Sequence, residues 1–318
     1  MAIFVIGAAF LYLVFKGTDW SDLWQKMLET NYAWMAVGLA VSLVSHWLRA
    51  YRATMLYQPM GFKVSTLNSL HAVLIGYFMN YFIPRGGEVS RCAALFKTNQ
   101  IPVEKSLGTV ITERLVDMVM LLLVIGVVFL LQFDVLYQYI SNQTGASANE
   151  SSSAKYIILA AMVLVPLAVW LIFKNNISRW PFYQKVLLKL KGFAQGLTSI
   201  KNVQQPFLFV ALSAGIWACY IFMMYFCFLA MSATAHLNFT QCLTVFAMGT
   251  IGVVIPAPGA GAGTYHYAVM QGLLLFGVAE DDGKAYATLV HGGQMIMFIV
   301  LGGISSLWVL TKRQVQAN

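Results

Sequence analysis

The sequence predicts an all-α integral membrane protein with about six transmembrane helices and two re-entrant hairpins that enter from opposite sides. Composition is the first reason: 59% of the 318 residues are hydrophobic and 10% are charged, whereas a soluble domain carries about 25% charged residues. The second is the length of the apolar runs, since roughly 20 helical residues cross a bilayer core. The third is a pair of breaks, rich in glycine and proline, that interrupt two of these runs.

Residues 1–132 form the first predicted half. Its apolar segments are residues 2–15, 32–56, 66–83 and 106–131. The first segment lacks a preceding basic region and a following cleavage site, so we expect a span and not a signal peptide. The third segment ends in "NYFIPRGGEVSR", where Pro84, Gly86 and Gly87 break the helix. Residues 66–96 are therefore predicted to enter the membrane and return to the same side.

Residues 155–318 form the second predicted half, after a polar external linker at 133–154. Its apolar segments are residues 156–173, 206–231, 239–255, 264–278 and 285–310. The break in "IPAPGAGAGTYHY" contains five helix breakers: Pro256, Pro258, Gly259, Gly261 and Gly263. Residues 239–278 are predicted to form the opposite hairpin, which makes the halves an inverted repeat. Such a repeat with broken helices at matching positions is typical of transporters.

Charge distribution predicts the topology. With six spans and two hairpins, fifteen lysines and arginines fall on one side and four on the other. Because cytoplasmic loops carry the excess of basic residues, both termini are expected in the cytoplasm and the protein in the cytoplasmic (inner) membrane. The basic segment 174–204 is expected to lie on the anionic inner leaflet.

Several classes of partner and cofactor are not expected. The net charge of +8 is better explained by asymmetry across the membrane than by nucleic-acid binding. The four cysteines show no paired spacing, so neither a disulfide nor a metal site is predicted. No nucleotide-binding loop occurs in the sequence. We expect no cofactor and no catalytic residue.

Three charges in "TERLVD" lie inside the apolar segment 106–131. Glu113 and Asp117 are four residues apart and share a helix face, and Arg114 lies three residues from Asp117. Charges at such depth are costly and normally face the protein interior in pairs. Arg114 is therefore the expected partner of both acids. One interpretation is an ion-pair network that only holds the hairpin in place.

The other interpretation is a polar cleft that binds an anionic headgroup. Arg85, Arg91 and Arg114 would hold a phosphate, because the planar guanidinium donates two parallel hydrogen bonds. Helix N-termini after Pro84 and Gly263 would add favourable dipoles. The predicted substrate-binding residues are Asn80, Arg85, Glu88, Arg91, Glu113, Arg114, Asp117, Tyr265 and His266.

These motifs carry a resemblance that covers nearly the whole chain. "NYFIPRGGEVSR", "ERLVD", "WLRAYR" and the late Pro-x-Pro-Gly-x-Gly break resemble the lysylphosphatidylglycerol synthase transmembrane-region family. That family is the flippase-like membrane part of the multiple peptide resistance factor and also occurs in stand-alone form. The resemblance implies lipid translocation, with Arg85, Glu88, Arg91, Glu113, Arg114 and Asp117 on the family's polar motif positions.

The sequence departs from the family pattern in two places. The family usually carries a glutamate shortly after the glycines of the second hairpin, where this chain has Tyr265 and His266. A histidine there is either a hydrogen-bonded core residue or a group that gains and loses protons. The chain also carries no aminoacyl-transferase domain after "LWVLTKR", so we do not expect it to synthesise a lysyl-lipid.

The expected function is the movement of an anionic phospholipid, or a lipid-linked headgroup, between leaflets. The expected partners are membrane lipids, with a separate lipid-modifying enzyme and an oligomer both possible. One alternative is a membrane-embedded transferase that acts on a polyprenyl- or phospholipid-linked substrate. Another is a non-catalytic membrane assembly partner, which would leave the charges within the membrane unexplained.

Overall fold

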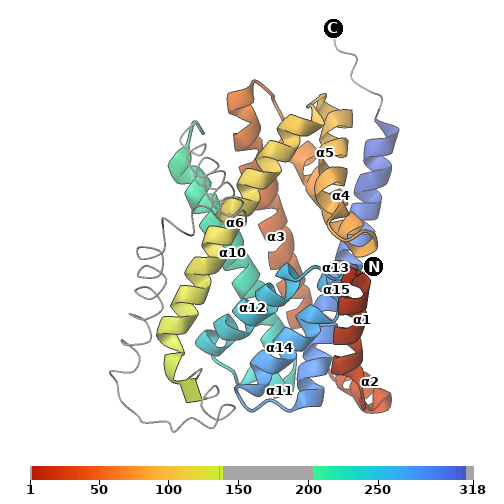
Figure 1. Ribbon diagram of the computed structural model, residues 1–318, viewed down its shortest axis with the longest axis vertical. Helices are drawn as coiled ribbons and strands as arrows, with labels where there is room; N and C mark the ends of the chain where they lie inside the picture. Colours follow the sequence, from red (N-terminus) through yellow and green to blue (C-terminus); the bar gives the residue numbers. More distant parts are fainter. Residues whose placement is uncertain (1, 136, 139–202, 313–318) are drawn as a thin grey trace, which may run out of the picture.

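The protein is entirely helical over the residues that the structure, a computed structural model, describes: 2–135, 137–138 and 203–312 (Figure 1). The helices are α1 (Ala2–Phe15), α2 (Trp20–Leu28), α3 (Tyr32–Tyr57), α4 (Thr66–Phe82), α5 (Gly86–Asn99), α6 (Val103–Leu131), α10 (Pro206–Phe228), α11 (Ser232–Ala235), α12 (Phe239–Val254), α13 (Pro258–Gly261), α14 (Thr264–Leu274) and α15 (Glu280–Thr311). The predicted span 156–173, most of the linker 133–154 and nearly all of the basic segment 174–204 lie outside the described residues.

Four of these helices are long and apolar enough to cross a membrane: α3 with its following turn, α6, α10 and α15. Large apolar side chains on their outer faces stay exposed, including Leu122 and Leu123 of α6 at 59% and 57% and Leu307 of α15 at 66%. Such faces are stable against lipid and unstable against water. The predicted class of helical membrane protein is therefore confirmed.

Helix α1 does not have the length of a full span. Its 14 residues extend about 21 Å, less than the roughly 30 Å of a bilayer core. In Figure 1 it begins half way along the molecule, near α13, and runs down to α2. The expectation that residues 2–15 form one of six full spans therefore lacks support, and the positions of the termini relative to the membrane stay a prediction.

Helix α2 is a short amphipathic helix that the apolar pattern did not predict. Asp19 caps it, because the Ser21 hydroxyl and N–H donate to Asp19 Oδ1 at 2.7 and 2.8 Å. These hydrogen bonds lower the pKa of the Asp19 carboxyl. Trp20 and Trp24 are each 62% exposed on its surface, where tryptophans are typical of a membrane–water boundary.

Helices α4 and α5 form the first hairpin. The chain reverses at Pro84 and Arg85, and Arg85 adopts a left-handed conformation with φ of 61°. The two helices approach closely because glycines face each other: a Cβ on Gly76 would lie 3.0 Å from the Gly87 carbonyl oxygen. Asn80 Oδ1 accepts a hydrogen bond from the Gly87 N–H at 2.9 Å. Gly87 therefore permits this approach. Gly86 and Gly87 were predicted to break the helix, but they are the first two residues of α5, and the break lies at Pro84 and Arg85.

Helices α12, α13 and α14 form the second hairpin. Left-handed conformations concentrate at its break, where Gly259, Ala260, Gly261 and Gly263 have φ values of 63°, 55°, 97° and 88°. A Cβ on Gly252 of α12 would lie 2.6 Å from the Thr264 carbonyl oxygen of α14. Close backbone approach thus holds the second hairpin as it holds the first.

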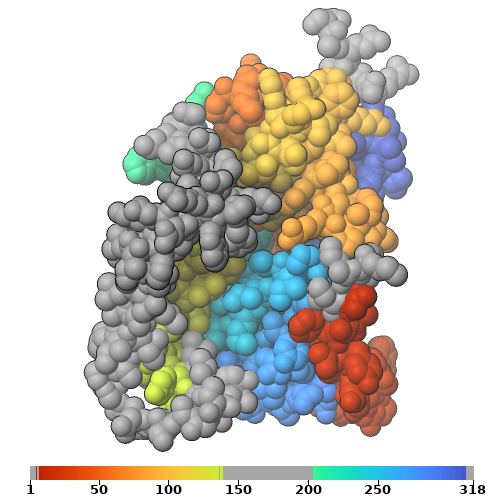
Figure 2. Space-filling view, in the orientation of Figure 1, coloured from red at the N-terminus to blue at the C-terminus, as the bar shows by residue number. Residues whose placement is uncertain are grey.

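The two hairpins occupy opposite halves of the molecule. In Figure 1, α4 and α5 lie in the upper half and α12 and α14 in the lower half, with both breaks near the middle. In Figure 2 the orange region of the first hairpin likewise lies above the cyan and light-blue region of the second. Long helices pack beside them: α3 contacts α10, and α15 contacts both α4 and α14. This packing brings α3, α5 and α6 together around the charged residues.

Candidate functional site

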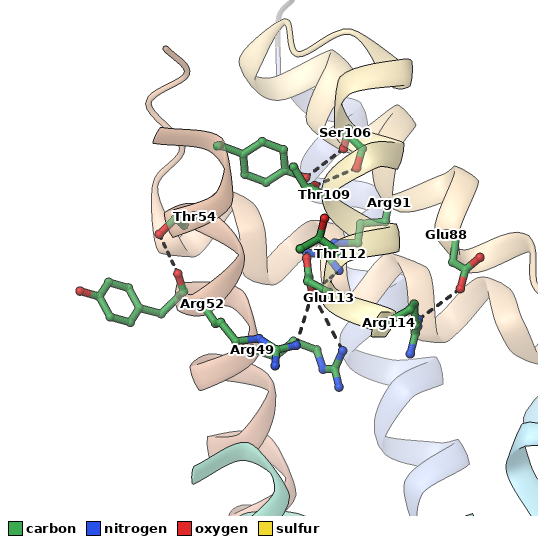
Figure 3. Close-up of polar contacts among 12 residues, drawn as sticks. Arg49, Arg52, Thr54, Glu88, Arg91, Ser106, Thr109, Thr112, Glu113 and Arg114 are labelled. Atoms are coloured by element: carbon green, nitrogen blue, oxygen red, sulfur yellow. Dashed lines mark hydrogen bonds and ion pairs between the residues drawn. The ribbon is translucent and has the colours of Figure 1, made fainter. Parts of the chain in front are cut away.

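Five charged residues form a buried charge cluster between α3, α5 and α6. Its members are Arg49, Arg52, Arg91, Glu113 and Asp117. Figure 3 shows that Glu113 projects from α6 toward the arginines of α3 and α5. The exposed fraction is 9% or less for every member and 1% for Glu113. The cluster is therefore shielded from the surroundings of the protein.

Arg91 and Glu113 form the closest pair of the cluster. The two guanidinium nitrogens Nη1 and Nη2 of Arg91 donate to Oε2 and Oε1 of Glu113 at 3.0 and 2.7 Å. This bidentate geometry is the strongest form of an arginine–carboxylate contact. Because Arg91 belongs to α5 and Glu113 to α6, the pair fastens the first hairpin to a long helix.

Asp117 is held by the two arginines of α3. Arg49 Nη1 lies 2.9 Å from Asp117 Oδ2, and Arg52 Nη2 lies 3.0 Å from Oδ1. The same arginines lie 4.0 and 3.9 Å from Glu113 Oε2. The acids thus share the arginines, as expected for residues four apart on one helix face.

Helix α10 supplies neutral partners to the cluster. Arg49 Nε donates to the Tyr220 hydroxyl at 3.1 Å, and Arg52 Nη1 donates to Ser213 Oγ at 2.9 Å. In the described part of the chain, Nε of Arg52 and of Arg91 makes no hydrogen bond. Three arginines face two carboxylates, so the cluster has one positive charge in excess and donors to spare.

A small pocket opens beside the cluster at the first hairpin. Its lining includes Arg49, Asn80, Glu88, Arg91 and Arg114. The pocket has a volume of about 20 Å³, enough for about one water molecule and too small for a phosphate group. The space between α3, α4, α5 and α6 therefore does not hold a phosphate in this arrangement of the helices.

Arg114 does not contact the acids that it was expected to neutralise. Its Nε donates to Glu88 Oε1 at 3.2 Å, and the two side chains are 48% and 36% exposed. The reason is helical geometry, since neighbouring residues point about 100° apart around the axis. Glu113 faces inward, so Arg114 faces the edge of the hairpin. The expectation that Arg114 pairs with Glu113 and Asp117 is wrong.

The remaining predicted site residues lie in three places. Asn80 lines the pocket, and Arg85 is exposed at the turn of the first hairpin. Tyr265 and His266 are buried in α14 of the second hairpin, at 8% and 5% exposure. The breaks of the two hairpins meet where α13 contacts α4, but neither Tyr265 nor His266 contacts the charge cluster directly.

The predicted binding residues did not include Arg49 and Arg52, although both belong to the "WLRAYR" motif and to the fifteen basic residues assigned to one side of the membrane. Both lie within α3, five or more residues before its end at Tyr57, and their exposed fractions are 4% and 0%. Their position before the end of an apolar segment was a signal, because a charge inside a span normally faces the protein interior. Their partners lie on another segment, which the sequence did not indicate.

Comparison with known proteins identifies the family of the chain. A family model described as "Lysylphosphatidylglycerol synthase TM region" matches residues 1–302. No curated protein and no solved structure matches the chain. The match covers nearly the whole sequence and confirms the resemblance carried by its motifs. The chain therefore belongs to the lysylphosphatidylglycerol synthase transmembrane-region family, whose description points to a lipid-related function in the membrane.

Proposed function

We propose that the protein is a lipid translocase that moves an anionic phospholipid, or a lipid-linked headgroup, between membrane leaflets. The observation that carries this proposal is the excess positive charge of the buried charge cluster, next to a pocket at the first hairpin. An uncompensated charge at such depth raises the free energy of the folded protein unless an anion binds next to it. Phosphate suits the site because arginine binds it in a bidentate manner.

We further propose that both hairpins are re-entrant and enter from opposite sides of the cytoplasmic membrane. Their helices have 17, 14, 16 and 11 residues, so the longest spans about 26 Å, less than the bilayer core. Apart from the four-residue helices α11 and α13, the order of a long helix, two short helices and a long helix occurs twice in the described residues. This order supports an inverted repeat with its polar path between the hairpin tips.

In this proposal the ion pair between Arg91 and Glu113 holds α5 against α6 and keeps the lipid path closed. The closed pocket is too small for a headgroup, so α5 must separate from α6 for a lipid to enter. A phosphate that reaches Arg91 would replace Glu113 as its bidentate partner. Glu113 would then lie near Arg49 and Arg52, at 4.0 and 3.9 Å, which limits the cost of opening.

The lipid leaves the path chemically unchanged in this proposal, and no cofactor takes part. The acyl chains stay in the bilayer while the headgroup passes along the hairpin tips. A separate enzyme would supply any modified headgroup. A translocase differs in this respect from a transferase, because a transferase changes the covalent structure of its lipid.

The test is headgroup accessibility in proteoliposomes that contain the purified protein and a fluorescent phospholipid. We expect faster exchange between leaflets for a phosphatidylglycerol than for a phosphatidylcholine, and both lipids recovered intact by mass spectrometry. Arg91→Lys keeps the charge but loses bidentate geometry, so exchange should fall at least about tenfold, equivalent to about 1.4 kcal/mol.

A matched control lies on the same helix as the cluster. Glu104 is an exposed acid in the first turn of α6, and Glu104→Gln should keep the wild-type rate, whereas Glu113→Gln should not. Equal rates for anionic and zwitterionic lipids, or a full rate in Arg91→Lys, would refute the anion-binding role. A lipid recovered with altered mass would favour the transferase.

A further inference from the structure

A groove lies between α1 and the break of the second hairpin. Its volume is about 460 Å³, compared with about 20 Å³ for the pocket beside the charge cluster. We call it the α1 groove, and its lining consists of Gly7, Ala8, Leu11, Pro258, Gly259 and Ala262. These residues have apolar side chains or none. The α1 groove therefore differs in chemistry from the pocket at the first hairpin, which arginines line.

Glycines hold the walls of the α1 groove close together at one edge. A Cβ on Gly7 would lie 2.6 Å from Cδ of Pro258, and a Cβ on Gly263 would lie 2.8 Å from the Gly7 carbonyl oxygen. The Gly263 N–H donates to Nδ1 of His266 at 3.3 Å, which fixes the start of α14 beside this contact. Because the two backbones already touch here, α1 cannot move inward to close the groove.

Aromatic residues define the depth of the α1 groove in the membrane. The ring of Phe15, at the end of α1, stacks on Trp20 of α2 with 5.3 Å between ring centres, and an exposed tryptophan marks the membrane–water boundary. Gly7 lies eight residues before Phe15, which is about 12 Å along a helix. Half of a bilayer core is about 15 Å. The groove therefore lies near the middle of the bilayer.

Hydrocarbon chains are the groups that surround the protein at this depth. Leu11 in the lining is 36% exposed, and Val5 and Leu13 on the same helix are 64% and 56% exposed, so the groove continues the lipid-facing surface of α1. Water does not fill an apolar space, and an empty one leaves its lining atoms without dispersion contacts. A flexible hydrocarbon chain avoids both penalties. The volume also lies within the range of about 300–1,000 Å³ that ligand pockets have.

We propose that the α1 groove binds a fatty acyl chain of a membrane phospholipid. The chain enters from the lipid-facing side of α1 and packs on Pro258 and Gly259, where the left-handed conformation of Gly259, with φ of 63°, interrupts the helix. The binding involves no covalent step.

The position of the groove suggests a use for the bound chain. The break also contacts the first hairpin, since α13 packs against α4, so the chain lies beside the place where the two hairpin tips meet. There it would stay while the headgroup of the same lipid passes along the tips. This use rests on the proposed function, whereas the binding of the chain does not.

Photocrosslinking of the full-length protein in lipid nanodiscs tests the site without a transport assay. The probe is a phosphatidylcholine with a diazirine at the middle of one acyl chain, and mass spectrometry of peptides locates the label. Labelling at residues 258–262 should exceed that at Leu122 and Leu123 of α6 at least about threefold, because a pocket encloses most of the surface of its ligand. Contact with bulk lipid alone would give the reverse order, since Leu122 and Leu123 are 59% and 57% exposed and Pro258 and Gly259 are half-buried.

Two variants that fill the α1 groove should remove this preference. Ala8→Phe introduces a ring from an exposed position of α1, and Ala262→Phe introduces one from the break. Labelling at residues 258–262 should fall at least about threefold in each, because a ring and a chain cannot occupy the same space. Ala9→Phe is the matched control, since Ala9 is exposed on the same helix but outside the lining, and its labelling should equal that of the wild type. Thermal unfolding identifies any variant that does not fold, and the other variant then decides.

Three results would overturn the proposal. Labelling at residues 258–262 no higher than at Leu122 and Leu123 would mean contact with bulk lipid only, or a groove covered by a second copy of the chain. Unchanged labelling in the folded phenylalanine variants would mean that the chain lies elsewhere. Loss of the label on addition of a trace of polyprenyl phosphate would make an isoprenoid chain the occupant.

Lipid exchange in proteoliposomes forms a separate arm of the experiment. A wild-type protein that moves no lipid yet shows the labelling contradicts the proposed function and supports the acyl-chain site. Normal exchange in Ala8→Phe together with loss of the label supports the site and overturns its use in translocation. Slowed exchange in Ala8→Phe, with a normal rate in Ala9→Phe, supports both.

Discussion

Replacing Arg91 by glutamine should destabilise the protein far more than the same change at Arg114. Arg91 is 6% exposed, and it is the bidentate partner of Glu113, which is 1% exposed. Removing one partner of a buried pair leaves an uncompensated charge and costs about 3–5 kcal/mol. Arg49 and Arg52 remain near Glu113 at 4.0 and 3.9 Å. We therefore expect the lower end, about 3 kcal/mol.

Arg114→Gln is the same substitution at an arginine outside the buried charge cluster. Arg114 and Glu88 are 48% and 36% exposed, and an exposed ion pair contributes at most about 1 kcal/mol. The difference between the two variants should therefore be about 2 kcal/mol in free energy of unfolding, roughly a 30-fold change in the unfolding equilibrium.

The assay is thermal unfolding in detergent with a dye that becomes fluorescent on reaction with thiols. Cys92, Cys227 and Cys242 are buried and free, so the dye reports loss of tertiary structure both beside Arg91 and away from the charge cluster. The double variant Arg91→Gln with Glu113→Gln should recover part of the stability, because it leaves no unpaired carboxylate. Equal destabilisation by Arg91→Gln and Arg114→Gln would refute the assignment of partners.

Three further outcomes are expected. Gly87→Ala should destabilise the protein by about 1–3 kcal/mol through overpacking, because its Cβ would press against the Gly76 carbonyl. Gly126→Ala should be neutral or stabilising, since nothing lies within 4 Å of that position. Thermal unfolding compares the two variants, and equal effects contradict close packing at the hairpin. Arg85→Ala should slow lipid exchange in proteoliposomes with little loss of stability, because Arg85 is exposed; a normal rate removes it from the headgroup path. Cysteines at the exposed positions of Lys63 and Glu104 should react with an impermeant reagent from the same side of the membrane; labelling from opposite sides rules out a re-entrant first hairpin.

The sequence by itself determined where several helices begin and end. Apolar runs predicted α3 and α12 to within one residue at each end, because hydropathy changes sharply where a helix leaves lipid for water. Proline indicated the break of the first hairpin, and glycine together with proline indicated the break of the second, since these residues interrupt or reverse the helix. The presence of Glu113 and Asp117 inside an apolar helix also determined that a buried polar site exists, because lipid tolerates no unpaired charge.

The tertiary structure alone decided which residues meet at that site. Arg49 and Arg52 lie about 60 residues before the acids, and only the packing of α3 against α6 brings them within 3.0 Å of Asp117. The same packing determines that Arg114 pairs with Glu88. The face of α6 that carries Glu113 turns inward, whereas the neighbouring face that carries Arg114 does not. Likewise, the bond between His266 and Gly263 exists because the hairpin break orients one N–H toward the ring. Hydropathy places a residue along the membrane normal, but pairing depends on the rotation and register of helices, which the contacts between them determine.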